Sequence, residues 1–133
     1  MAVVRGHFEG SGIINKPIYR PDPMKTLCAC GDMPGSESAV THWDSLFAGD
    51  EYSLLSLRLE TGRTHQIRVH FASEGAPLAG DTMYGAPEGF IGHHLLHCAE
   101  CDVVHPASGG EVYLCAPPPQ DFADFCRSFI PED

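Results

Sequence analysis

The segment LETGRTHQIRVH, residues 59–70, constrains this chain more than any other part of it. A run in which leucines alternate with other residues, 53–59, leads into the segment and predicts a half-buried strand. A Thr-Gly pair then supplies a turn, and Thr64 is a candidate N-cap for a short helix that ends near Glu74. Gly75 follows, as is typical of a helix C-terminus. The segment therefore predicts a strand, a turn and a short helix in direct succession.

Basic side chains are concentrated in this part of the chain. Three of the eight Lys/Arg residues and two of the eight histidines lie in or beside the segment. At helical spacing Ile67, His70 and Phe71 share one face, and Arg68 lies with His65 on the neighbouring face. The apolar face would anchor the helix, so the segment predicts an arginine held in a fixed position.

Length and composition predict one soluble globular domain, with 133 residues of which 43% are hydrophobic. No apolar run is long enough to span a bilayer, and the first residues lack a secretory pattern. We therefore expect no membrane contact and an intracellular protein, cytoplasmic or organellar, whose six cysteines stay reduced. The net charge of −10 opposes strong nucleic-acid binding by this chain, unless its few cations gather at one site.

Short extended runs separated by glycine and proline make up most of the remaining sequence. This pattern predicts an α+β domain with a mixed, mainly antiparallel sheet and few short helices, as a single unit over residues 1–133. Strands are expected at residues 2–6, 13–18, 24–30, 39–47, 53–59, 95–104 and 111–115, and an amphipathic helix at residues 121–129.

The central segment continues without a gap into a second patterned run, G-x-P-L-x-G-D-x-x-Y-G at residues 75–85. Together the two runs resemble the hallmark of the RluA-type pseudouridine synthases, enzymes that isomerise uridine to pseudouridine in RNA. Residues 96–99, 105–109 and 116–119 resemble later segments of the same family. The resemblance implies a partial pseudouridine-synthase-like catalytic domain that acts on uridine-containing rRNA or tRNA and needs no metal or organic cofactor.

The resemblance also implies roles for single residues. Arg68 would be the active-site arginine, which pairs with the catalytic aspartate and helps to hold the target nucleotide. A guanidinium suits both tasks because it forms bidentate, charge-assisted hydrogen bonds and stays charged. RNA contacts are expected at Arg63, His65, Gln66 and Tyr84. The alternatives are a turn-stabilising role for Arg63 and His65 and a bracing role for Gln66.

The family's nucleophilic aspartate, in a His-Arg-Leu-Asp context, and its catalytic tyrosine have no counterpart among the 133 residues. The carboxylates near the central segment stand in other contexts: Asp44, Glu51, Glu60 and Asp81. Asp81 is expected to cap backbone amides. We therefore expect the chain to be inactive alone, with the missing N-terminal part of the same domain as a partner.

Two structural expectations follow from a missing part. Arg68 should be accessible and unpaired beside an apolar wall, and the strand at residues 2–6, or a neighbour, should expose an unpaired edge. An Arg68 that is bonded to an acid of this chain and sealed from solvent would be incompatible with the active-site assignment.

Two other functions are compatible with the residues. A non-catalytic RNA-binding remnant of the family would use the same arginine without chemistry. A small zinc-binding interaction module would use cysteines and histidines such as those of Cys28-x-Cys30 and Cys98-x-x-Cys101. A Cys-x-Cys pair on a strand has the wrong geometry for a zinc knuckle, so we expect no metal site.

Overall fold

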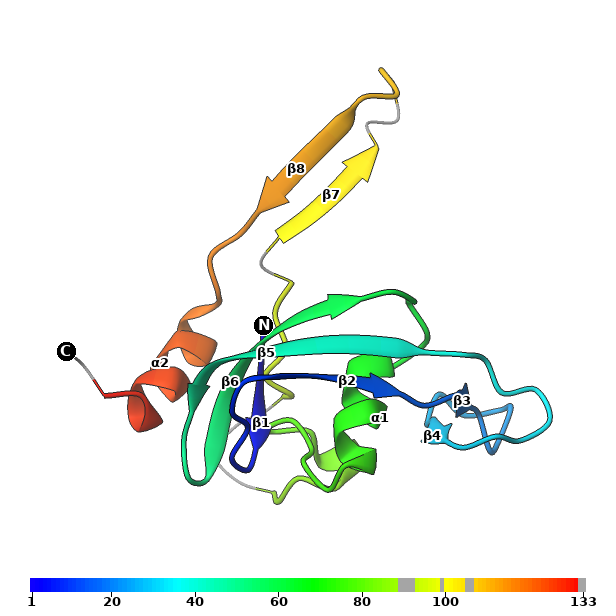
Figure 1. Ribbon diagram of the computed structural model, residues 1–133, viewed down its shortest axis with the longest axis horizontal. Coiled ribbons are helices and arrows are strands. Elements are labelled where there is room, and N and C mark those ends of the chain that lie inside the picture. The colour runs from blue at the N-terminus through cyan, green and yellow to red at the C-terminus, as the bar shows by residue number, and fades with distance from the viewer. Residues whose placement is uncertain (89–92, 99, 105–106, 132–133) are drawn as a thin grey trace.

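The computed structural model describes residues 1–88, 93–98, 100–104 and 107–131. Its centre is a four-stranded sheet with the strand order β1-β6-β5-β2 (Figure 1). These strands are β1 Ala2–Arg5, β2 Ser11–Asn15, β5 Val40–Ala48 and β6 Tyr52–Leu59. Two small antiparallel pairs are β3 Ile18–Tyr19 with β4 Ala29–Cys30, and β7 Glu100–Val104 with β8 Glu111–Cys115. The helices are α1 Gln66–Ser73, the short 3-10 helix η1 Thr82–Tyr84, and α2 Gln120–Phe129.

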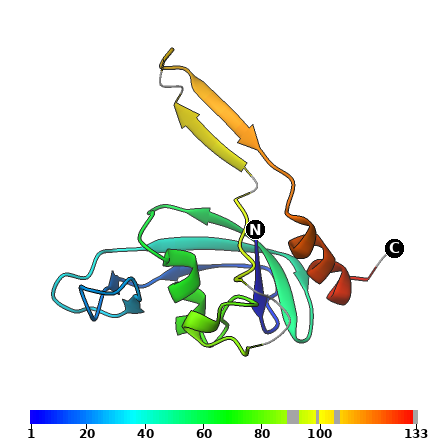
Figure 2. The ribbon, with the colours of Figure 1, turned by 180° about the vertical axis from the view of Figure 1, so that it is seen from behind.

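The two α-helices pack against opposite faces of β1. Helix α2 lies at the end of the central sheet that is farther from β3 and β4 (Figures 1 and 2). Side chains alternate between the faces along β1, so Val4 packs with Phe71 of α1 while Val3 packs with Phe122 of α2. The amphipathic pattern of the last helix is confirmed, because Phe125 and its apolar neighbours join the second cluster. The expected α+β class with a mainly antiparallel sheet and few short helices is also confirmed.

An open edge was expected at the first strand or at a neighbour, and the first of these alternatives is wrong. Two later segments of the chain lie along the outer edge of β1: the Val3 amide donates to the Leu95 carbonyl at 3.1 Å, and the Ala79 amide donates to the Val3 carbonyl at 2.9 Å. At the other edge of the sheet, β2 pairs only with β5 among the described strands, and Ile13 is 61% exposed there. The open edge therefore lies at β2.

Two predicted strands differ from the structure. Of residues 24–30, only Ala29 and Cys30 are extended, because Asp22 turns the preceding chain by accepting a hydrogen bond from the Met24 amide at 3.0 Å. The strand expected at residues 95–104 begins at Glu100, and Leu95 and Leu96 lie along β1 instead. Residues 99, 105 and 106 of the expected strand and turn lie outside the described residues.

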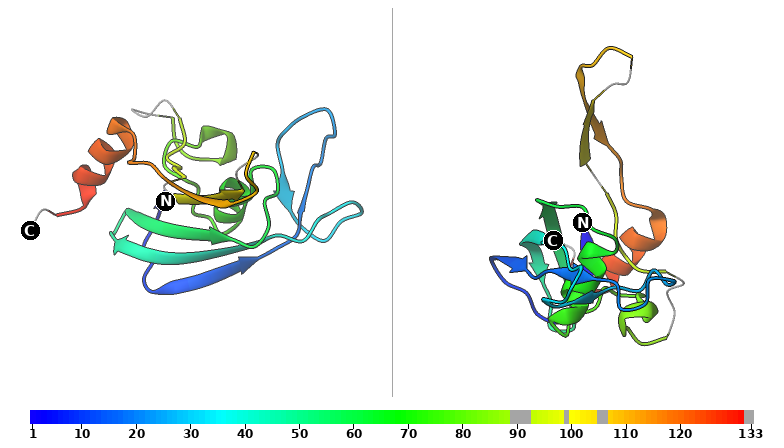
Figure 3. Two further views of the ribbon diagram at one scale, coloured as in Figure 1. Left: turned by 90° about the horizontal axis from the view of Figure 1, so that it is seen from above. Right: turned by 90° about the vertical axis from the view of Figure 1, so that its right-hand side faces the viewer.

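The β7–β8 hairpin stands away from the sheet and its two helices (Figures 1 and 3). Its strands pair with each other over five residue pairs, from Glu100 opposite Cys115 to Val104 opposite Glu111. Within the described part of the chain, no helix is long and apolar enough to cross a membrane.

Candidate active site

Helix α1 begins one residue later than the Thr64 prediction places it. His65 is the N-cap residue, with a left-handed backbone (φ 54°) and no capping hydrogen bond from its side chain. The Gln66 side chain instead closes the turn before the helix, since its Oε1 accepts a hydrogen bond from the Arg63 amide at 3.0 Å. The predicted C-terminus is confirmed: Gly75 has a φ of 75° and its amide donates to the Ala72 carbonyl at 3.0 Å.

Gln66 lies in a buried polar network between α1 and β5 and is only 3% exposed. Its Oε1 also accepts from the Thr61 hydroxyl at 2.7 Å. Its Nε2 donates to the Val40 carbonyl at 3.0 Å and to the Thr41 hydroxyl at 3.1 Å. Both ends of the amide are therefore satisfied within the protein. This geometry fits the bracing alternative for Gln66 and leaves the amide no surface for RNA.

His70 completes the network and is fully buried. Its Nε2 lies 2.9 Å from the Lys16 carbonyl, and its Nδ1 lies 2.8 Å from the Thr41 hydroxyl. A carbonyl oxygen can only accept, so Nε2 carries the proton and Nδ1 accepts from the hydroxyl. Burial lowers the pKa of His70 below its ordinary value. The imidazole is therefore a neutral strut that fastens α1 to β5 and to the chain after β2.

Arg68 forms a bidentate ion pair with Asp81 on the neighbouring face of α1. Nε donates to Oδ2 at 2.9 Å and Nη2 donates to Oδ1 at 2.8 Å, which raises the pKa of Arg68. The guanidinium carbon also lies 5.1 Å from the centroid of the Tyr84 ring. The pair anchors the loop after α1 to the helix.

This ion pair corrects two expectations. Asp81 binds the arginine rather than capping backbone amides, because its side chain makes no capping bond to η1. Arg68 is neither unpaired nor widely accessible, since its side chain is 13% exposed and that of Asp81 is 1% exposed. Arg68 is bonded to an acid but not fully sealed, and its Nη1 makes no hydrogen bond to a described residue. The active-site assignment therefore depends on this remaining edge of the guanidinium.

His65 and Tyr84 are joined directly and lie beside the ion pair. The His65 Nδ1 is 2.7 Å from the Tyr84 hydroxyl, which also accepts the Cys28 amide at 3.0 Å. Burial, followed by the charge of Arg68, lowers the pKa of His65, and burial raises the pKa of Tyr84. Both side chains stay partly exposed beside Arg68.

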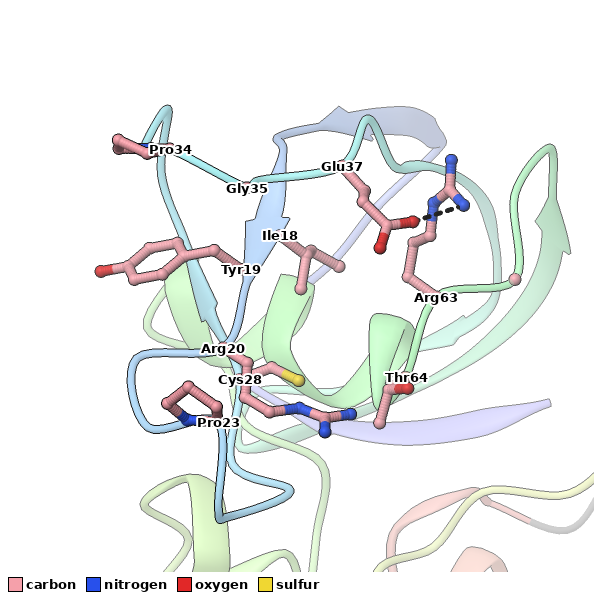
Figure 4. Close-up of a pocket in the computed structure, with 11 residues that line it drawn as sticks. Ile18, Tyr19, Arg20, Pro23, Cys28, Pro34, Gly35, Glu37, Arg63 and Thr64 are labelled. Carbon is pink, nitrogen blue, oxygen red and sulfur yellow. Dashed lines mark ion pairs between the residues drawn. The ribbon is translucent and has the colours of Figure 1, made fainter.

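Arg63 lies in the turn before α1 and is engaged on two sides. Its Nε donates to the Ser38 carbonyl at 2.9 Å, and its Nη1 lies 2.7 Å from a Glu37 carboxylate oxygen. This is the turn-stabilising geometry, although 37% of the Arg63 side chain remains exposed. A pocket of about 490 Å³ opens beside this turn, between it and the chain around β3 (Figure 4).

Several residues chosen from the sequence do not join the site. Of the four nearby carboxylates only Asp81 bonds Arg68, and Glu60 pairs with His42 at 2.7 Å instead. Among the described residues, no group of three or more histidine, cysteine or acidic side chains is arranged to hold a metal. Sequence reasoning missed Asp81 as the partner of Arg68, 13 positions away, although both belong to the same ungapped motif.

A protein-family model that is described as RNA pseudouridylate synthase matches residues 1–73, which is more than half of the chain. The chain belongs to the RNA pseudouridylate synthase family.

Individual relatives agree with this membership. The Bacillus subtilis protein described as uncharacterized RNA pseudouridine synthase YhcT is 41% identical over 90% of this chain. Ribosomal large subunit pseudouridine synthase D of Salmonella typhimurium is 39% identical over 92% of it. The chain spans 39% and 41% of the lengths of these two relatives.

Solved structures of the family show the same fold. Human RNA pseudouridylate synthase domain containing 1 aligns with a TM-score of 0.71 and 30% identity, over 89% of this chain and 53% of its own. Human RNA pseudouridylate synthase domain containing 4 aligns with a TM-score of 0.73 over 99% of this chain and 62% of its own. At 21% identity, the second likeness concerns the fold alone.

Proposed function

We propose that this chain supplies the arginine side of an active site that isomerises uridine to pseudouridine in rRNA or tRNA. The observation that carries the proposal is the fixed Arg68, held by Asp81 with one edge of its guanidinium left over, within a chain of this family. Through Nη1 the arginine can donate to the catalytic aspartate or to the target nucleotide. His65 and Tyr84 lie beside Arg68 and are partly exposed, so they can contact a flipped base, and Arg63 is exposed enough to meet a phosphate.

The chain alone is proposed to be inactive. The carboxylate bonded to Arg68 is that of Asp81, which is 1% exposed and has both oxygens bonded to the guanidinium. A nucleophile must reach the sugar of the target nucleotide, and a carboxylate locked in this way cannot. The aspartate would therefore come from a part of the longer relatives that this chain does not match. No metal or organic cofactor takes part in the proposed reaction.

Complementation tests this function. Purified chain is incubated with uridine-containing rRNA or tRNA, alone and together with the part of YhcT that the chain does not match. Pseudouridine is measured by mass spectrometry of digested RNA. We expect no product from either polypeptide alone and product from the mixture, and Arg68→Lys in this chain should abolish it. Product formed by the chain alone would contradict the proposal.

RNA binding gives a second test. The chain should bind RNA weakly, with a shallow salt dependence from on the order of two or three phosphate contacts. Arg63→Ala and Arg68→Ala should each reduce that slope. A chain that binds RNA but yields no product in the complemented mixture would instead support a non-catalytic RNA-binding remnant of the family.

A further inference from the structure

The pocket beside the turn before α1 is built from segments that are far apart in the sequence. Ile18 of β3 and Cys28 face it from one side, and Thr64 faces it from the turn on the other (Figure 4). The Arg20 guanidinium extends into the pocket toward Thr64, while the Arg63–Glu37 pair lies at the opposite end. Its volume of about 490 Å³ is within the range of small-ligand sites, roughly 300–1,000 Å³.

Two positively charged side chains line this pocket, although the net charge of the chain is negative. The net charge is −10 and there are only eight Lys/Arg residues, yet Arg20 and Arg63 both line this one pocket. Arg20 is exposed and forms no ion pair with a described residue, whereas Lys16 is neutralised by Glu74 at 3.0 Å. A free arginine that points into a pocket of an acidic protein indicates an anionic ligand at that place.

The pocket is adjacent to the Arg68 site. The Cys28 amide donates to the Tyr84 hydroxyl, and Tyr84 carries the guanidinium of Arg68 over its ring. Burial and Arg68 lower the pKa of His65, and the charge of Arg20 adds to the same effect. A chain of nucleotides with its target base near Arg68 would therefore place a neighbouring phosphate near Arg20.

Glu37 is the one lining residue that opposes an anion. Its ion pair with Arg63 is 2.7 Å long, but the two side chains are 63% and 37% exposed. Exposed pairs of this kind contribute little to stability, so a phosphate can replace the carboxylate on Arg63. The Ser38 carbonyl would keep the Nε edge of Arg63 in position during this exchange.

We propose that this pocket binds one ribonucleotide of the RNA next to the target uridine, with Arg20 and Arg63 as phosphate ligands and Glu37 as a competing anion. The proposal rests on the RNA-binding function above and assigns that site a second nucleotide position. It predicts effects of opposite sign for two variants. Removal of Arg20 should weaken RNA binding, and neutralisation of Glu37 should strengthen it.

The test is the affinity of the complete chain for a fluorescent uridine pentanucleotide, measured by anisotropy at several salt concentrations. Arg20→Ala should weaken binding about fivefold and lower the salt slope by about 0.7, the loss of one phosphate contact on a single strand. Glu37→Gln should tighten binding about threefold. Matched controls at the other end of the molecule are Arg127→Ala on α2 and Glu9→Gln before β2. The controls should change the affinity by less than half as much.

The outcomes separate this inference from the proposed function. If Arg68→Ala weakens binding and Arg20→Ala does not, the pocket assignment is wrong and the function stands. If Arg20→Ala weakens binding and Arg68→Ala does not, the nucleotide pocket stands and the active-site assignment fails. Equal losses in Arg20→Ala and Arg127→Ala, or weaker binding by Glu37→Gln, would overturn the pocket. Competition by inorganic phosphate as strong as that by uridine monophosphate would also overturn it.

Discussion

The two polar faces of α1 differ in how they use hydrogen bonds. On the face toward β5, neutral groups of Gln66, Thr41 and His70 bond to one another and to nearby backbone groups, and all three are buried. On the neighbouring face, the charged pair of Arg68 and Asp81 is bonded on one side and retains an open edge on the other. One short motif therefore contains both a buried neutral scaffold and a charged arginine that is only partly bonded. The scaffold fixes the helix so that the arginine is held in place.

The largest expected effect comes from breaking the charged pair. Arg68→Ala leaves the Asp81 carboxylate buried without its partner, which should lower the free energy of unfolding by about 3 kcal/mol or more. The double variant Arg68→Met/Asp81→Leu should recover most of that loss because it leaves no unpaired charge. Urea denaturation followed by circular dichroism measures the unfolding free energies of both variants. A double variant as unstable as the single one would show that the pair matters through packing rather than charge.

A smaller loss is expected from the neutral network. Thr41→Val keeps the shape of the side chain but removes the hydroxyl between Gln66 and His70, so two buried groups lose a partner. The expected loss in unfolding free energy is about 1–3 kcal/mol. Thr26→Val is the matched control at an exposed position and should cost less than about 0.5 kcal/mol. Equal effects at the two sites would contradict the scaffold role.

The pH dependence of stability should reveal the buried histidine of the network. The pKa of His70 is lowered from 6.5 by burial, so below pH 6.5 the unfolded chain binds a proton that the folded chain does not. Stability present above pH 6.5 is therefore lost as the pH falls from 6.5 to the lowered pKa. His70→Gln should flatten this slope in denaturation series between pH 5 and 7. An unchanged slope would show that His70 does not titrate on unfolding.

The smallest effect on stability is expected at Tyr84, whose ring lies beside Arg68. Tyr84→Phe removes the hydroxyl that His65 and the Cys28 amide share but keeps the ring beside Arg68. The loss in unfolding free energy should be about 1 kcal/mol. Thermal denaturation can measure it against His93→Gln, which removes an exposed ion pair with Asp121. A loss in unfolding free energy as large as that of Arg68→Ala would show that the Tyr84 hydroxyl is needed to hold the fold.

The sequence predicted most of the scaffold and little of the site's pairing. Alternating leucines located β6, and Gly75 located the end of α1, because both signals are local. The start of α1 was misplaced by one residue because the Gln66 side chain closes the turn before the helix, and its position depends on a bond to β5 as well. The Arg68–Asp81 pair was missed because helix spacing says nothing about a loop that returns to the helix.

The contacts along the edge of β1 were also not predicted from the sequence. The first strand was expected to be open, but residues 77–79 and 95–97 fold back along it. Residues 77–79 were not expected to be extended, and residues 95–97 were expected only as the start of the strand over residues 95–104. Each segment is held along β1 by only a few backbone hydrogen bonds. Contacts of this kind depend on the finished fold, so the order of residues does not predict them.

The most direct test of the division between the two faces is the uridine pentanucleotide affinity of two folded variants. Arg68→Met/Asp81→Leu removes the open guanidinium edge, and Thr41→Val weakens only the scaffold. At a temperature where both remain folded, the double variant should bind at least about fivefold more weakly, and Thr41→Val should bind as the unmodified chain does. A double variant with unchanged affinity would contradict the account, because the arginine would then serve the fold alone.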